Sequence, residues 1–149
     1  MKPVAKTHFA VLGYFSVLLS LGGCGETLEC DSPEARNSVI RMMADDTNNA
    51  LVNFAAKNSS VVAAMMGRAA ADADRLTILE TAKRGAAYKL DDTIAMRSRD
   101  RAAHAVTCSG TLAVTVEDAT ASKQVDFSVK QTTDGGIVVS VEPFRFAAQ

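Results

Sequence analysis

The chain has no tryptophan, and aromatic residues make up only 5% of it. A ring-lined cleft of the kind that often binds sugars is therefore not expected. Basic residues are not in excess either, because 16 Lys and Arg residues stand against 17 Asp and Glu residues. This balance gives no electrostatic reason for the chain to bind nucleic acid. Apolar runs are also short of the roughly 20 residues that a membrane-spanning helix needs.

The longest apolar run lies near the start of the chain and has the order of an export signal. Lys2 and Lys6 precede it, it covers residues 9–21, and it leads into Leu21-Gly22-Gly23-Cys24. Basic residues, an apolar run and then small residues are typical of a secretory signal. The last four residues resemble a bacterial lipobox, which implies that Cys24 is acylated and becomes the new N-terminus. The alternative is ordinary signal peptidase cleavage, which would give a secreted protein without lipid.

Cleavage before Cys24 would divide the chain into a signal peptide (1–23), a lipidated tether (24–29) and a single domain (30–149). At most about 20 Å of extended chain would then separate the anchor from the domain, which is expected close to the bilayer. The signal contains two lysines and no acid, so the mature chain has a net charge near −3. Gly25 stands where an Asp retains many Gram-negative lipoproteins in the inner membrane. By that resemblance the protein is expected in the outer membrane, facing the periplasm.

The three cysteines are an odd number, which would leave one without a partner in an oxidising compartment. If Cys24 carries lipid, Cys30 and Cys108 remain as a pair, and export places them where disulfides persist. A bridge between them would close a long loop and stabilise the fold by about 4 to 5 kcal/mol in the loop-entropy model. The alternatives are two buried thiols, or an intermolecular bridge through Cys30.

Helical spacing occupies the first half of the mature chain. Asp31-Ser32-Pro33-Glu34 is a helix start, with Asp31 as cap, and an apolar stripe then predicts one helix to about Lys57. Its stripe is Ile40, Met43, Thr47, Leu51 and Phe54. Asn58-Ser59-Ser60 offers caps for a second helix, which ends at Gly85 and either continues or breaks before Leu76.

From Tyr88 onward the period becomes two, which predicts strands. The first carries Tyr88, Leu90, Ile94 and Met96, and the second runs from His104 to Val116 with His104 on its apolar face. Turns are expected at 99–101, 117–122 and Asp134-Gly135-Gly136. The result is an α+β fold, in which N-terminal helices pack on a four-stranded antiparallel meander sheet.

The order of these elements, with Cys108-Ser109-Gly110-Thr111-Leu112 on a strand and Thr133-Asp134-Gly135-Gly136 before the last one, resembles a group of small bacterial lipoproteins. These have cystatin-like or NTF2-like α+β domains. The resemblance implies a curved sheet wrapping a helix, sometimes with a pocket between them. It places no catalytic motif on this sequence, so it carries fold and location only.

Few residues of the mature chain have recognisable chemistry. His104 is its only histidine, so no metal site, cofactor or catalytic residue is predicted, and its expected role is structural. Arg97, Arg99 and Arg101 have period-two spacing, which would put three guanidiniums on one side of a hairpin to contact lipid head groups or an acidic partner. The simpler interpretation is a solvated turn. Pro143-Phe144-Arg145-Phe146 either fastens the tail to the sheet or presents an edge to a partner.

Two functions from different classes fit these features. The favoured one is a non-enzymatic envelope lipoprotein, an accessory or protein-binding module at the membrane surface whose partner is an unidentified envelope protein. The alternative is an NTF2-like domain that binds or transforms a small apolar molecule between helices and sheet, with His104 and Tyr88 as polar contacts.

Overall fold

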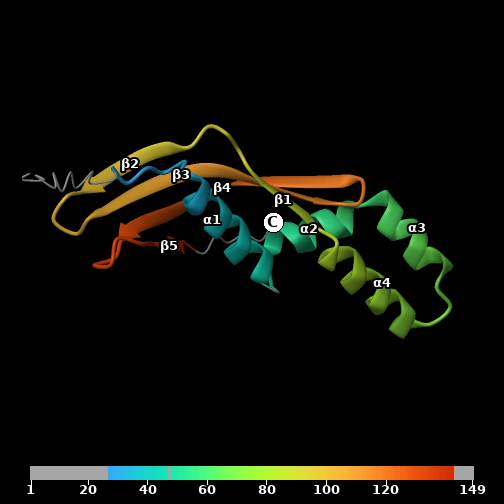
Figure 1. Cartoon of the computed structure of the whole chain (residues 1–149). Coiled ribbons are helices and arrows are strands. Elements are labelled where there is room, and N and C mark those ends of the chain that lie inside the picture. Colours follow the sequence, from blue (N-terminus) through green and yellow to red (C-terminus); the bar gives the residue numbers. More distant parts are fainter. Residues whose placement is uncertain (1–26, 47, 143–149) are drawn as a thin grey trace, which may run out of the picture.

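The computed structural model describes residues 27–46 and 48–142, and this part of the chain has the predicted α+β fold (Figure 1). Four helices come first and a curled antiparallel sheet of five strands follows. The helices are α1 (Pro33–Asp45), α2 (Ala50–Asn58), α3 (Ser60–Arg68) and α4 (Asp72–Arg84). The strands are β1 (Ala87–Leu90), β2 (Ala95–Asp100), β3 (Ala105–Val116), β4 (Ala119–Gln131) and β5 (Ile137–Val141).

The single helix predicted to about Lys57 is two helices, because polar side chains interrupt it between α1 and α2. The Asp46 carboxylate accepts a hydrogen bond from the Asn48 backbone N–H at 3.0 Å. The buried Asn49 side chain caps α2 by accepting from the Leu51 N–H, and its amide donates to the Met43 carbonyl at 2.8 Å. Asx side chains that bond to nearby backbone in this way compete with helical hydrogen bonds.

The N-cap of helix α1 lies one residue later than predicted. Ser32, not Asp31, is the N-cap, and its hydroxyl accepts a hydrogen bond from the Ala35 N–H at 3.2 Å. The apolar stripe also differs in detail, since Phe54 is 52% exposed. The side chains that α1 and α2 bury against the sheet are Ala35, Val39, Met43, Leu51, Val52, Ala55 and Ala56.

The second predicted helix breaks at residues 69–71 into α3 and α4, which pack against each other. We call this pair the distal hairpin. It extends beyond the end of the sheet and packs against α2, whereas α1 and α2 lie along the sheet (Figure 1). Only Val62 of α3 and Ala82 of α4 are buried. The distal hairpin is therefore held by few core contacts.

The sheet is the predicted meander with its first strand in two pieces. Strand β4 pairs with β3 over its length and with β5 at one end, while β1 and β2 occupy successive stretches of the other edge of β3. The break between them crosses Gly110 of β3. A Cβ there would lie 3.3 Å from a Leu90 methyl and 3.4 Å from Cγ1 of Ile94. Glycine thus allows the connecting segment to pass close to the central strand.

One face of the sheet forms the core with the helices, and the other is polar. Phe127 and Leu112 are completely buried on the inner face. The outer face of β3 and β4 carries small polar side chains, among them Thr107, Thr111, Thr115, Ser122 and Ser128. The apolar side chains of β3 and β4 therefore face the helices, as their alternation with polar residues in the sequence predicted.

The turns differ from their predicted positions because the strands are longer. Strand β2 continues through Asp100, so the first turn shifts from residues 99–101 to 101–104, and β4 begins at Ala119, so the second contracts from 117–122 to 117–118. His104 and Glu117 have positive φ values of 47° and 51° in these turns. His104 is thus an exposed turn residue, and its prediction on the apolar face of the strand is wrong.

Candidate functional site

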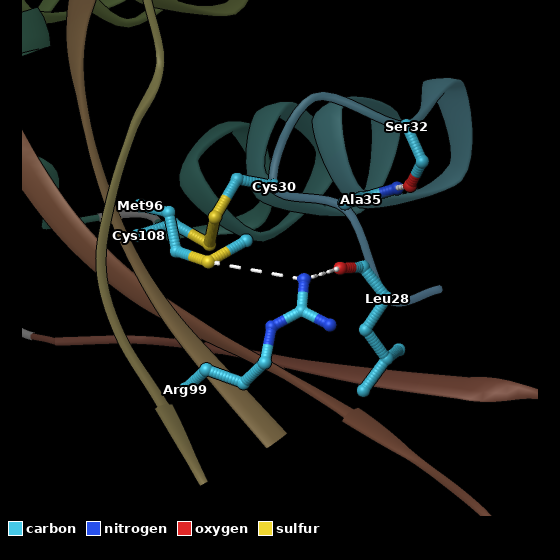
Figure 2. The surroundings of a disulfide bond; sticks show 7 residues. All are labelled: Leu28, Cys30, Ser32, Ala35, Met96, Arg99 and Cys108. Atoms are coloured by element: carbon cyan, nitrogen blue, oxygen red, sulfur yellow. Dashed lines mark hydrogen bonds between the residues drawn. A yellow bond between two sulfur atoms is a disulfide. The ribbon is translucent and has the colours of Figure 1, made fainter. Parts of the chain in front are cut away.

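The segment that precedes α1 is fixed by the disulfide between Cys30 and Cys108, as the sequence predicted (Figure 2). The two Cα atoms are 5.7 Å apart, and 78 residues separate the cysteines in the chain. Cys108 is completely buried at the centre of the sheet, paired with Phe127 on β4 and Met96 on β2. The start of α1 is therefore covalently joined to the sheet.

A second attachment lies two residues before Cys30. The Arg99 guanidinium donates a hydrogen bond from Nη2 to the Leu28 carbonyl at 3.1 Å, and the same nitrogen lies 3.9 Å from the Met96 sulfur (Figure 2). The Leu28 side chain packs against the core. These contacts fix residues 27–30 at one end of the sheet, beside the β2–β3 turn, and we call this the tether end.

A groove of about 360 Å³ lies at the tether end, and we call it the basic groove. It is lined by Arg99, Asp100, Arg101 and His104 from the β2–β3 region, and by Thr27 and Leu28 from the incoming segment. The Asp100 carboxylate accepts a hydrogen bond from the Ala103 N–H at 2.9 Å, which orders the turn. Two guanidiniums and an imidazole thus share a concave surface with one carboxylate.

The sequence grouped Arg97 with Arg99 and Arg101, and the structure brings together only the latter two. A register shift between Met96 and Ser98 places a bulge at Arg97, so the alternation on which the grouping rested is interrupted. Arg97 does not line the basic groove. Contact of the arginines with a partner or a head group remains a prediction, and only Arg99 and Arg101 lie together in the groove where such a contact could form.

A second groove of about 590 Å³ also adjoins Thr27 and Leu28, and its character is different. Glu29 and Glu34 line it, together with the apolar side chains of Val129 and Ile137. The incoming segment therefore borders one groove with basic side chains and another with acidic ones.

At the other end of the molecule, Asp118 in the β3–β4 turn fastens the distal hairpin to the sheet. Its carboxylate accepts hydrogen bonds from the Ser59 hydroxyl at 2.6 Å, from the Ser60 hydroxyl and from the Val61 N–H at 3.3 Å. The donation by Ser59, and then by Ser60, lowers the pKa of Asp118 far below its usual value. Ser59 is also the N-cap of α3, accepting from the Val62 N–H at 3.1 Å.

The distal hairpin exposes apolar side chains. Leu76 is 64% exposed on α4 and Val61 is 40% exposed on α3. A shallow groove of about 250 Å³ lies between the two helices and the β3–β4 turn, lined by Met65, Ile78 and Ala82 among others. Neither Leu76 nor Val61 lines this groove, so the distal hairpin presents separate exposed apolar side chains beside it.

The two residues proposed as polar contacts in a helix–sheet pocket lie far apart. Tyr88 pairs with Val114 on β3, whereas His104 precedes Ala105 at the other end of that strand. About nine strand residues, or roughly 30 Å, separate these positions. Burial raises the pKa of the Tyr88 hydroxyl, and the charge of Asp46 adds to this effect. The structure does not bring Tyr88 and His104 into one site.

Two further observations concern residues 27–46 and 48–142 alone. They contain no group of three or more His, Cys, Asp or Glu side chains placed to hold a metal ion. No helix among them is long and apolar enough to cross a membrane. Cys24 and Pro143-Phe144-Arg145-Phe146, for which the sequence predicted lipidation and a role of the tail, lie outside the described residues.

Sequence reasoning did not identify all the residues of the basic groove. The sequence predicts a structural role for His104, or a ligand contact together with Tyr88, and gives no signal at Thr27 or Gln131, although all three line the groove. Their proximity depends on the disulfide and on the Arg99–Leu28 hydrogen bond, which join segments some 70 residues apart. A pairing inference from Cys30 and Cys108 was the one sequence signal that could have brought Thr27 near β3.

Comparisons with protein-family models, with curated proteins and with solved structures found no match.

Proposed function

We propose that this protein is a non-enzymatic envelope lipoprotein, anchored through lipid on Cys24, that serves as an accessory or protein-binding module at the membrane surface. The observation that carries the proposal is the Cys30–Cys108 disulfide. It accounts for two of the three cysteines, and it is of a kind that persists in exported proteins. Cys24, at the end of a lipobox-like segment, is the cysteine that remains.

The arrangement of the two ends supports a surface role. Thr27 lies only three residues after Cys24, so a lipidated Cys24 would hold the tether end within about 10 Å of the bilayer. The distal hairpin lies at the opposite end of the molecule (Figure 1). It would then point away from the membrane and offer Leu76 and Val61 to an envelope protein. By the resemblance at Gly25, this membrane is the outer one and the domain faces the periplasm.

The first test is the intact mass of the protein recovered from the membrane fraction, measured after denaturation with and without reductant. We expect residues 24–149 plus acyl groups, and a gain of two hydrogens on reduction. A Cys24→Ala variant should carry no acyl group and still contain the Cys30–Cys108 bridge. An unmodified chain, or a chain beginning at another residue, would refute the lipoprotein assignment.

The protein-binding part of the proposal has its own test. A photoreactive residue at Leu76 should form a discrete adduct in intact cells, whereas one at Val138 should not. Val138 is a matched control because it is a similarly apolar side chain, 52% exposed, on β5 rather than on the distal hairpin. The absence of an adduct at Leu76 and at Val61 would contradict a partner at this surface.

The alternative, a small apolar ligand held by Tyr88 and His104, gains nothing from the structure. Roughly 30 Å of strand β3 lies between the two side chains. A ligand of a few carbon atoms cannot span that distance.

A further inference from the structure

The basic groove has the side chains that bind a phosphate group. Arg99 and Arg101 supply guanidinium N–H groups in the planar arrangement that matches phosphate oxygens, and His104 adds an exposed imidazole. The negative charge of Asp100 offsets one of these positive charges, and its carboxylate accepts a hydrogen bond from the Ala103 N–H in the turn. With His104 neutral, the groove has one net positive charge, in a mature chain whose own net charge is negative.

Arg99 is already oriented within this groove. Its Nη2 donates to the Leu28 carbonyl, and this contact draws the guanidinium across the incoming segment, as Figure 2 shows. Leu28 itself is held by Cys30, two residues later, through the disulfide. The orientation of the Arg99 guanidinium is thus coupled to the disulfide that fixes the segment before α1.

The position of the groove indicates which phosphate it meets. Thr27 lines the groove and lies three residues after Cys24, a reach of about 10 Å at full extension. The head-group region is a layer of about 6 Å on each side of the hydrocarbon core. An anchor at Cys24 would therefore hold the groove in or beside a layer of phosphodiesters.

We propose that the basic groove binds the phosphate of a membrane phospholipid head group, with Arg101 and His104 contacting it and Arg99 completing the site. This inference rests on the proposed function, since it requires the anchor at Cys24. The contact orients the tether end toward the bilayer. It also distinguishes Arg99 and Arg101 from Arg97, which lies at the bulge of β2 outside the groove.

His104 provides the measurement, because it is the only histidine in residues 24–149. The protein purified from membranes is reconstituted into vesicles of phosphatidylglycerol and phosphatidylcholine (3:7), or kept in a phosphate-free detergent. Its reaction with diethyl pyrocarbonate at His104 is followed by mass spectrometry. We expect slower modification in vesicles than in detergent, and a loss of this protection at high salt.

An Arg101→Gln variant separates groove binding from simple proximity to the membrane. Removing one basic side chain near an anionic surface should weaken head-group binding about fivefold and reduce the protection of His104 accordingly. Arg84→Gln, at the exposed end of α4 on the distal hairpin, is the matched control and should leave the protection unchanged.

The outcomes are distinguishable. Equal protection in Arg101→Gln and the unaltered protein would mean that the membrane merely shields His104, and would overturn the inference. Full protection in detergent by 10 mM inorganic phosphate would identify free phosphate as the ligand and also overturn it. The intact mass of the same sample reports acylation separately. Acylated protein without protection refutes the groove but not the proposed function, whereas protein without an acyl group refutes both.

Discussion

Breaking the disulfide between Cys30 and Cys108 should lower the free energy of unfolding by about 4.5 kcal/mol. The bridge closes a loop of 78 residues, and the loop-entropy relation for a loop of that size gives about 15 cal/mol/K, or about 4.5 kcal/mol at 25 °C. That is a large fraction of the roughly 5–15 kcal/mol typical of a domain. The corresponding fall in melting temperature is on the order of 15 °C.

The assay is urea unfolding of the oxidised and reduced protein, followed by far-ultraviolet circular dichroism. Reduction removes only the covalent link, whereas a Cys30→Ala/Cys108→Ala variant also removes both sulfur atoms from the core, where Cys108 is completely buried. The variant should therefore be no more stable than the reduced protein. The m-value should rise in both, because the unlinked chain exposes more surface on unfolding. A loss below about 1 kcal/mol on reduction would refute the loop-entropy reasoning.

Three other predictions follow from single side chains. Asp118→Asn should weaken the attachment of the distal hairpin, which amide exchange would detect as faster exchange in α3 and α4 with little change in the sheet. Because folding lowers the pKa of Asp118, its carboxylate stabilises the fold above its ordinary pKa and loses this effect as the pH falls. The free energy of unfolding of the variant should therefore decrease less on acidification than that of the unaltered protein. Phe127→Ala should cost about 3–5 kcal/mol in urea unfolding, because the ring is completely buried, while Val138→Ala at an exposed position should change stability by less than about 0.5 kcal/mol. Arg99→Ala should release the Leu28 carbonyl and accelerate proteolysis before Cys30 without altering the melting of the sheet, and unchanged proteolysis would show that the disulfide alone holds the segment.

The class of fold could be predicted because it depends on short-range patterns. Alternating residues on β3 and β4, such as Val114 and Val116 against Thr115, place one face inward whatever the rest of the chain does. The break between α1 and α2 could not be inferred from the apolar stripe. It depends on the Asn49 side chain reaching the Met43 carbonyl, a tertiary detail of a polar residue in a helical pattern.

The candidate site shows the same division. Pairing of Cys30 with Cys108 follows from the count of cysteines once Cys24 is assigned to lipid, and the structure confirms the pair. The basic groove depends on the disulfide and the Arg99–Leu28 hydrogen bond, which bring residues 27 and 28 to the β2–β3 turn. The bulge that leaves Arg97 outside the groove has no signature in the sequence. Period-two spacing therefore overestimated how many of the arginines share one surface.

The covalent link has a mechanical consequence when the chain is pulled from its two ends. A pulling force applied between Cys24 and the end of β5 would pass from Cys30 directly into β3 through the sulfur atoms. The four helices, β1 and β2 lie within the closed loop, outside the covalent path of that force. About 280 Å of contour is withheld from extension while the disulfide is intact. Stretching in a force spectrometer should accordingly yield a short extension in oxidising buffer and a much longer one after reduction.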